Sequence, residues 1–305
     1  MVMLGVLLLA GGPAAGQGRW SAETPTLPMA KTWLAYKAKG LPPYRPPRTP
    51  DGVPDLQGDW GEPGGAGGDD IEEHEYVDST TPPQESFVAD PPDGKIPYTP
   101  WALAKQQEHR AGLARGWPGE TGQRLHADPA SFCFTTIGPR GSGGVEIIQR
   151  PGSVIMIAPN KHRVIPTDGR PHSKNPDPTF NGESIGHWEG DTLVVDTIAI
   201  DERMRNISVG RSGDANAWTH SKEERVIERF TRNSKNYLTY QLTVIDPVVL
   251  EKPFTSAPHT WTLAQSPSDV WTEYHCTANE EPFHYQNLSP EFRKQYETQG
   301  VQGQP

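Results

Sequence analysis

Short strand-like runs separated by turn residues succeed one another between residues 145 and 275 of this 305-residue chain. The clearest run, YLTYQLTVI at 237–245, alternates between side chains that suit a core and side chains that suit water. This period of two is that of a strand with one buried face. Because short strands joined by tight turns pair antiparallel, the pattern predicts an all-β, mainly antiparallel fold. We expect an up-and-down β-barrel of the lipocalin-like kind, with a twisted sandwich as the alternative.

The region holds about nine expected strands, several of them joined by Gly-containing turns. They are 145–149, 153–158, 162–166, 185–188, 192–200, 224–231, 237–245, 259–263 and 270–275. An earlier tripeptide, Gly58-Asp59-Trp60, is a weaker signal for an opening strand whose Trp closes one end of the barrel.

One helix is predicted before the strands. Thr99 suits the N-cap, Pro100 suits the first turn, and the run WALAKQQEHRAGLARG ends at Gly116. Its apolar positions are expected to pack against the outside of the sheet; they are Trp101, Leu103, Ala104 and Leu113. A second short helix is expected at 289–296.

Composition divides the chain into four parts. Residues 1–16 are predicted to be a signal peptide and residues 17–93 a Pro- and Gly-rich arm with an acidic loop that packs on the body. Residues 94–290 are predicted to be the barrel domain and residues 291–305 a flexible tail. The acidic run around His74 indicates a solvated loop, since it lacks the ligand spacing of a calcium loop.

The first residues favour export. An apolar core at 2–10 is followed by small residues, the layout of a secretory signal peptide, although no Lys or Arg precedes the core. An ordinary buried strand or a mistranslated start is the alternative. We therefore expect a secreted or periplasmic protein. In an oxidising compartment Cys133 and Cys276 could form a disulfide, and two separate buried thiols are the other possibility.

The charge and the motifs exclude several classes of function. A net charge of -10 argues against nucleic acid as a partner, because phosphate binding needs a basic face. No later run is long and apolar enough to span a bilayer. No short metal-binding spacing occurs among the ten His, so we predict no metal site, although three of them from distant strands could meet. The sequence identifies no cofactor.

The segment 163–197 carries most of the side chains that could do chemistry. Asp168-Gly169-Arg170-Pro171-His172 reads first as a turn. The functional alternative is that this loop aims Arg170 and His172 into the barrel mouth, where His could act as acid or base and Arg could hold an anion. The second half, SIGHWEGDTLVVDT, is expected to be a hairpin that turns at Glu189-Gly190-Asp191, so its carboxylates are not predicted to be catalytic.

The run RVIERF at 225–230 separates its charges by face. Glu228 shares a face with Val226 and Phe230, whereas Arg225 and Arg229 lie on the opposite face. An ion pair lining the barrel interior and a cross-strand pair at the surface both remain open. Aromatic side chains could also stack flat ligands; the candidates are Trp60, Trp188, Trp218 and Trp261.

Several ordered motifs between residues 94 and 280 carry a family resemblance. They are GKIPYTPWALAK, DPASFC, EIIQRPGSVIMI, TDGRPH, SIGHWEGDTLVVDT, RVIERFTR and EYHC. The chain resembles a large family of secreted, mostly uncharacterised bacterial proteins. The resemblance implies export and a lipocalin-like body, and it implies no particular reaction. The family's motif positions fall on Arg163, 168–172, 188–191 and His220. The chain departs at His187, where the family often has Arg, and this puts any anion-binding role there in doubt.

We therefore expect a secreted small-ligand-binding protein with an apolar or aromatic ligand. The alternative is a secreted cofactor-independent or metal-dependent lyase, isomerase or hydrolase with His172 and His220 as acid and base in the barrel mouth, and Arg163 or Arg170 as electrostatic partner. The expected ligand-binding residues are Arg163, Asp168, Arg170, Trp188, Arg225 and Glu228.

Overall fold

The computed structural model describes residues 38, 40, 44–61, 71–73, 75, 83, 85–114, 145–158, 161–202 and 220–265, and the fold is reported for these residues. Several predictions lie outside them: the signal peptide at 1–16, both cysteines, Trp218, the strand at 270–275, the helix at 289–296 and the tail at 291–305.

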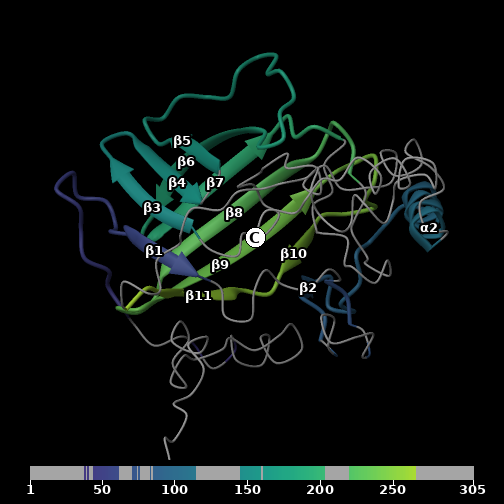
Figure 1. Cartoon of the computed structure of the whole chain (residues 1–305), viewed down its shortest axis with the longest axis horizontal. Coiled ribbons are helices and arrows are strands. Elements are labelled where there is room, and N and C mark those ends of the chain that lie inside the picture. Colours follow the sequence, from purple (N-terminus) through teal and green to yellow (C-terminus); the bar gives the residue numbers. More distant parts are fainter. Residues whose placement is uncertain are drawn as a thin grey trace, which may run out of the picture.

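The described residues form eleven strands and the helix α2 (Pro100–Ala114) (Figure 1). The strands are β1 (Gly58–Gly61), β2 (Val88–Asp90), β3 (Val145–Arg150), β4 (Ser153–Ala158), β5 (Lys161–Pro166), β6 (Glu183–Glu189), β7 (Thr192–Ile198), β8 (Arg225–Arg232), β9 (Tyr237–Ile245), β10 (Phe254–Ser256) and β11 (His259–Leu263). Eight of the nine expected strands lie in this part of the chain, and all eight form.

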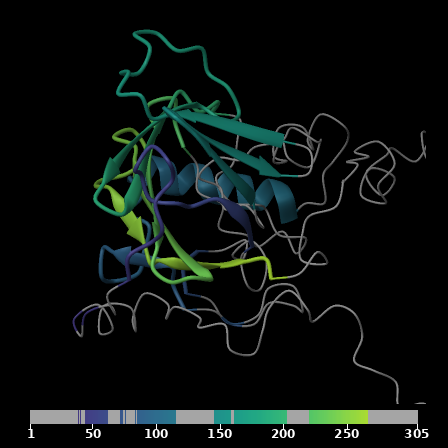
Figure 2. The same ribbon diagram turned by 90° about the vertical axis from the view of Figure 1, so that its left-hand side faces the viewer.

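Nine of the strands make a nearly closed antiparallel barrel in the order β5-β4-β3-β1-β11-β9-β8-β7-β6. The sheet curves so that its two ends approach each other, as the side view shows (Figure 2). The predicted all-β barrel is thus confirmed. The strand order is not a simple meander, however, because β1 and β11 lie between β3 and β9.

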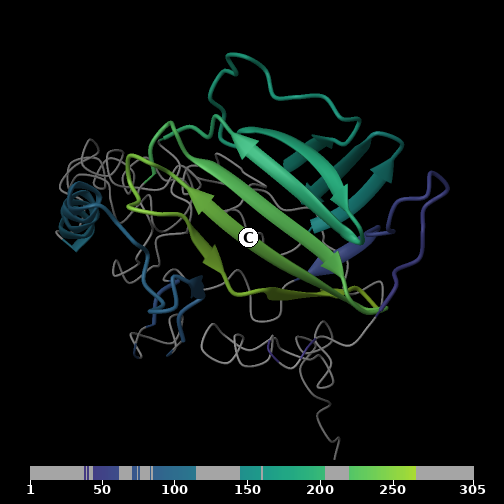
Figure 3. The ribbon, with the colours of Figure 1, turned by 180° about the vertical axis from the view of Figure 1, so that it is seen from behind.

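The strands β2 and β10 were not predicted. Each has three residues, which is too short for a period of two to stand out. They pair with each other, and β10 pairs with the end of β9 (Figure 3). Both β1 and β2 come from the segment 17–93 that was expected to be an arm, and both pair with strands of the body.

The barrel closes at a seam between β5 and β6 where the order of hydrogen-bonded strands ends. Eight antiparallel pairings separate β5 from β6, so the two strands run in the same direction. Parallel neighbours cannot be joined by a tight turn. The connection 167–182 therefore returns along the barrel, and it forms the long loop at the top of Figure 1.

Gly186 brings the two sides of the seam together. A Cβ atom on this residue of β6 would lie 3.0 Å from Cγ2 of Ile165 and 3.1 Å from Cγ2 of Thr167. The seam is therefore packed by Ile165 of β5, and by Thr167 just after it, against the backbone of β6.

Trp60 and Arg232 close one end of the barrel. Trp60 of β1 is fully buried and donates from Nε1 to the carbonyl of Leu56 over 2.7 Å. The guanidinium of Arg232 lies 5.3 Å from the centre of the Trp60 ring and donates to the carbonyls of Asp55 and Lys235. The Gly58-Asp59-Trp60 tripeptide thus lies in the first strand, with its Trp in the core.

At the opposite end β9 changes its partner. Its first half pairs with β11 as far as Tyr240, and Thr243 and Val244 pair with β10. The wall therefore divides between two strands at the level of Leu242. This division lies at the end of the barrel away from Trp60, whose β11 partner is Leu263.

The helix α2 begins as predicted, with Thr99 Oγ1 accepting a hydrogen bond from Ala102 N over 3.3 Å. For Trp101, Leu103 and Ala104 the prediction of the packing face was wrong, and the side chain of Leu113 lies outside the described residues. Trp101 and Leu103 are 52% and 44% exposed, whereas Ala102 and Gln106 are buried. Among the described residues no helix has the length and apolar character needed to cross a bilayer.

Candidate functional site

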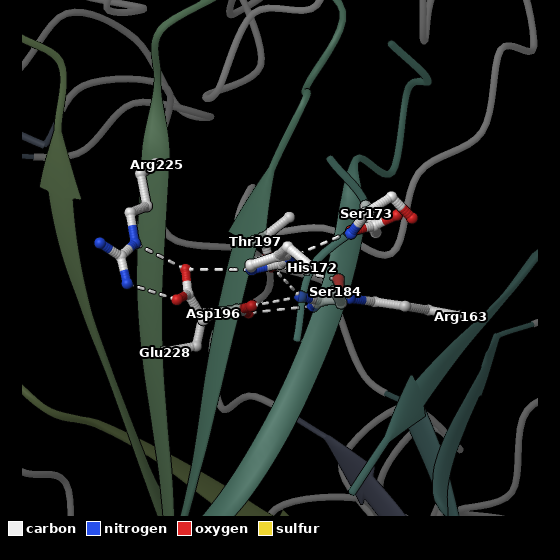
Figure 4. A network of polar contacts seen from close by, with 9 residues as sticks. Arg163, His172, Ser173, Ser184, Asp196, Thr197, Arg225 and Glu228 are labelled. Carbon is white, nitrogen blue, oxygen red and sulfur yellow. Dashed lines mark hydrogen bonds and ion pairs between the residues drawn. The ribbon is translucent and has the colours of Figure 1, made fainter. Parts of the chain in front are cut away.

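Two polar networks lie back to back on β6 and β7 (Figure 4). Successive residues of a strand point to opposite faces. Ser184 and Thr197 therefore face the barrel interior, while their neighbours Glu183 and Asp196 face outward. We call Arg163, Ser184, Thr197, Glu228 and Tyr240 the inner network. We call His172, Glu183, Asp196 and Arg225 the outer network.

The inner network is centred on an ion pair between Arg163 of β5 and Glu228 of β8, with side chains 3% and 2% exposed. Arg163 Nη2 lies 2.5 Å from Glu228 Oε2, and Nη1 lies 3.2 Å from Oε1. Two further donors of the same guanidinium reach hydroxyls across the seam, with Nε 3.0 Å from Ser184 Oγ and Nη2 2.7 Å from Thr197 Oγ1. The ion pair thus joins β5 to three strands on the other side of the seam.

Glu228 also accepts a hydrogen bond from Tyr240. The Tyr240 hydroxyl lies 3.2 Å from Oε1, and Ser184 Oγ lies 3.1 Å from Thr197 Oγ1. A buried charge is tolerated only when paired and hydrogen-bonded, and this network provides both conditions. Of the two arrangements left open for Glu228, the interior pair is the one that forms.

The outer network holds the connection 167–182 against the barrel wall. His172 Nδ1 lies 2.9 Å from Glu183 Oε1, and Nε2 lies 3.6 Å from Asp196 Oδ1, which is longer than a hydrogen bond. Asp196 accepts hydrogen bonds from Arg225, with Nε 2.8 Å from Oδ1 and Nη2 2.5 Å from Oδ2. This is a bidentate Arg–carboxylate pair, and it raises the pKa of Arg225.

Glu183 has its acidity set by the loop. The hydroxyl of Ser173, its backbone N–H at 2.7 Å and the His172 ring lower the pKa of Glu183. Hydrogen bonds to an ionised carboxylate favour that form. The ionised Glu183 is therefore part of what fixes this loop in place.

Asp168 and Arg170 belong to neither network. They form an exposed pair within the turn, with Arg170 Nε 2.9 Å from Asp168 Oδ1, and Gly169 between them has a φ of 82°. The hydrogen bonds from Arg170 lower the pKa of Asp168. This contact agrees with the interpretation of 168–172 as a turn. The Arg170 side chain points to Asp168 and not into the barrel.

His220 lies apart from His172. It is buried beside Glu224, with Nδ1 3.1 Å from Glu224 Oε2 and 3.2 Å from the carbonyl of Ser221. Ser221 in turn donates to Asp246 at the end of β9. The two histidines predicted to act together thus have different partners, one on the outer surface and one in the interior.

The remaining predicted residues also divide between the inner and the outer face of the barrel. Trp188 of β6 is partly buried and packs against the core, on the face of Ser184 and Gly186. Arg225 and Arg229 are on the outside, where Arg229 pairs with Glu189. The structure therefore brings Arg163 and Glu228 together and separates both from His172, Asp168, Arg170 and Arg225.

Sequence reasoning missed five residues of the networks: Glu183, Ser184, Asp196, Thr197 and Tyr240. Alternation within DTLVVDT was a usable signal, since it places Thr197 and Asp196 on opposite faces. Nothing local indicates that the face of Thr197 meets the side chain of Arg163, because the contact depends on closure of the barrel.

Fold and geometry together define a class: an antiparallel barrel with a hydrogen-bonded ion pair inside its wall. Among the described residues no group of His, Cys, Asp and Glu could hold a metal ion. No family model matches the sequence, and no curated protein or solved structure is significantly similar to it.

Proposed function

We propose that this chain is a secreted small-ligand-binding protein of the lipocalin-like type, with an apolar or aromatic ligand held inside the barrel. The observation that carries the proposal is the inner network, a set of hydrogen-bonded polar groups that lies beside apolar and aromatic side chains of the barrel interior. Small-molecule sites typically combine apolar walls with a few fixed polar groups, and barrel mouths are a common place for them. The end at which β9 divides its partners is the proposed mouth.

The aromatic side chains next to the network favour a flat or apolar ligand. Tyr240 stacks with Trp261 at a centroid distance of 5.2 Å, and Phe230 lies 5.0 Å from Tyr240. Tyr240 belongs to the inner network, and the rings of Phe230 and Trp261 lie between it and the end closed by Trp60 and Arg232. A ligand entering at the mouth would meet the polar groups first and the rings below them.

Binding is preferred to catalysis because of the histidines. The enzymatic alternative needs His172 and His220 to act on one substrate. Their partners, Glu183 and Asp196 on the outside and Glu224 in the interior, give them no shared site.

Export is supported by the apolar run at 2–10 and the small residues after it. The test is the N-terminal sequence of the protein recovered from the host's periplasm or medium. A chain that begins near residue 17 is expected, and an intact chain found only in the cytoplasm contradicts the proposal.

The binding function is tested with the uncharged dye Nile red. The wild-type protein is expected to bind the dye saturably with a blue-shifted emission. Val244 is buried at the end of the barrel proposed as the mouth, and Val244→Leu adds one methylene group there. This variant should weaken dye binding several-fold. Val248→Leu is the matched control, because Val248 is 45% exposed just beyond β9. A folded wild-type protein that does not bind the dye, or equal weakening by both variants, contradicts the proposal.

A further inference from the structure

We propose that the ligand is uncharged where it meets the inner network, and that the site discriminates against carboxylates. This inference rests on the proposed function and names the class of molecule that the same site accepts. It follows from the charges in this part of the interior.

The only Arg of the inner network is already neutralised. Arg163 and Glu228 face each other through two close contacts, so the pair has no net charge. The same guanidinium also donates to the hydroxyls of Ser184 and Thr197. An anionic ligand would have to displace Glu228 and leave a buried carboxylate without its cation, which is strongly unfavourable.

Two further buried carboxyl groups lie at this end, and neither offers an anion a free cation. Glu224 lies beside His220, and Asp246 accepts hydrogen bonds from Ser221, Val248 and Val249. In the described part of the chain the other buried guanidinium, that of Arg232, is at the closed end and contacts two carbonyls and the Trp60 ring.

The hydroxyl groups of the network suit an uncharged ligand. Ser184 and Thr197 each carry a hydroxyl that can rotate and act as donor or acceptor. An alcohol, ketone or amide could join this network by hydroxyl rotation, with the Arg163–Glu228 pair intact. Such a ligand makes hydrogen bonds without transferring a charge out of water.

The test uses three ligands that differ only in the charge of the head group. Bound Nile red is displaced by 1-dodecanol, dodecanoate or dodecylamine at neutral pH. We expect 1-dodecanol to displace the dye at a concentration at least about tenfold lower than either charged compound, because a charged head must be desolvated. Equal or stronger displacement by dodecanoate or dodecylamine would overturn the inference while leaving the proposed function intact. If Nile red does not bind to folded wild-type protein, both fail.

Glu228→Gln should change the preference. The variant leaves Arg163 without its counter-charge, so dodecanoate should displace the dye at least as well as 1-dodecanol. Glu189→Gln is the control: it changes the net charge equally but lies on the outer face against Arg229. It should keep the wild-type preference. Thermal unfolding verifies that each variant is folded.

If Glu228→Gln does not fold, the double variant Arg163→Gln/Glu228→Gln takes its place. It has no buried charge in the inner network and should retain the preference for 1-dodecanol. Loss of that preference in the double variant, or its persistence in folded Glu228→Gln, contradicts the inference.

Discussion

At the scale of single residues, we expect the largest loss of stability when one partner of the Arg163–Glu228 pair is replaced. Replacing Arg163 with Met leaves Glu228 charged and buried, and breaking such a pair destabilises proteins by about 3–5 kcal/mol. We therefore expect Arg163→Met to lower the free energy of unfolding by about this amount in urea titrations. Arg163→Met/Glu228→Leu should recover most of the loss, since apolar replacements of a whole pair are often neutral.

Arg225→Met is the matched control for this prediction. Arg225 also forms a bidentate pair, but its side chain is 51% exposed. Exposed pairs contribute about 0–1 kcal/mol, so the control should be nearly neutral. A double variant as unstable as Arg163→Met alone would show that the packing of the Arg, not the charge, stabilises the seam.

Glu183 gives the loop a pH dependence whose sign can be stated. Its pKa is lowered in the folded protein from an ordinary value of 4.5. A lowered pKa contributes stability that is present above the unfolded-state pKa and is lost as the pH falls through the folded-state value. In Glu183→Gln this loss disappears, so the stability difference between wild type and variant should shrink below about pH 4.5.

Urea unfolding between pH 7 and pH 3 measures this effect. Ser173→Ala removes the hydroxyl with the largest influence on Glu183, so the folded-state pKa moves back toward the ordinary value and the loss of stability in acid should be smaller than in the wild type. A difference between wild type and Glu183→Gln that stays constant down to pH 3 argues against the assigned contacts.

Local sequence predicts the face of a residue better than its partner. The face of Glu228 followed from the alternation in RVIERF, because strand period is set by the backbone alone. Its partner Arg163 lies 65 positions away, on a strand that meets β6 only through closure. His172 was a candidate for the barrel mouth, but the direction of its ring depends on where the connection 167–182 crosses the wall.

At the scale of elements, Gly186 measures how tightly β5 and β6 pack. Gly186→Ala places a Cβ about 3 Å from side-chain carbons of Ile165 and Thr167. We expect a loss of about 1–3 kcal/mol from overpacking, even though Ala suits a strand better than Gly. Thermal unfolding provides the measurement.

A second change at the same contact serves as its control. Thr167→Ser removes the Cγ2 atom that would crowd the new methyl group, so Gly186→Ala/Thr167→Ser should be less destabilised than the sum of the single variants. A stable Gly186→Ala variant would mean that the seam is looser than these contacts indicate.

Strands with a long run of alternating residues were predicted from the sequence, and the two shortest strands were not. The nine residues of β9 carry four full alternations, whereas β2 and β10 have three residues each and take their conformation from their neighbours. The start of α2 followed from Thr99 and Pro100, because capping is local. Its buried face depends on what lies beside it, and the sequence of the helix does not contain that information.

At the scale of the whole molecule, the number of strands determines the long connection. With nine strands joined by antiparallel pairings, the closing neighbours must be parallel, and a tight turn between them is excluded. The polar composition of 167–182 is therefore first a requirement of topology. Its histidine and its acidic partners on the wall anchor a segment that has to travel along the outside.

A disulfide across the seam tests this closure. Arg163 lies beside Ser184 and Ile165 beside Gly186, so Val164 and Ile185 should be neighbours on the outer face. Val164→Cys/Ile185→Cys, made with both native cysteines replaced by Ser, should form a disulfide on mild oxidation. By closing a loop of about 20 residues, the bridge should stabilise the protein by roughly 3 kcal/mol.

The register control is Val164→Cys/His187→Cys, which moves one thiol two residues along the same face of β6. Parallel strands in the observed register place this pair farther apart, and disulfide geometry tolerates little excess distance. We expect slow or absent cross-linking, measured by thiol titration and the mass of the peptide pair. Equal rates for the two pairs would show that β5 and β6 slide or separate in solution. The inner network would then hold together a seam that opens in solution, and would not be a permanent part of the wall.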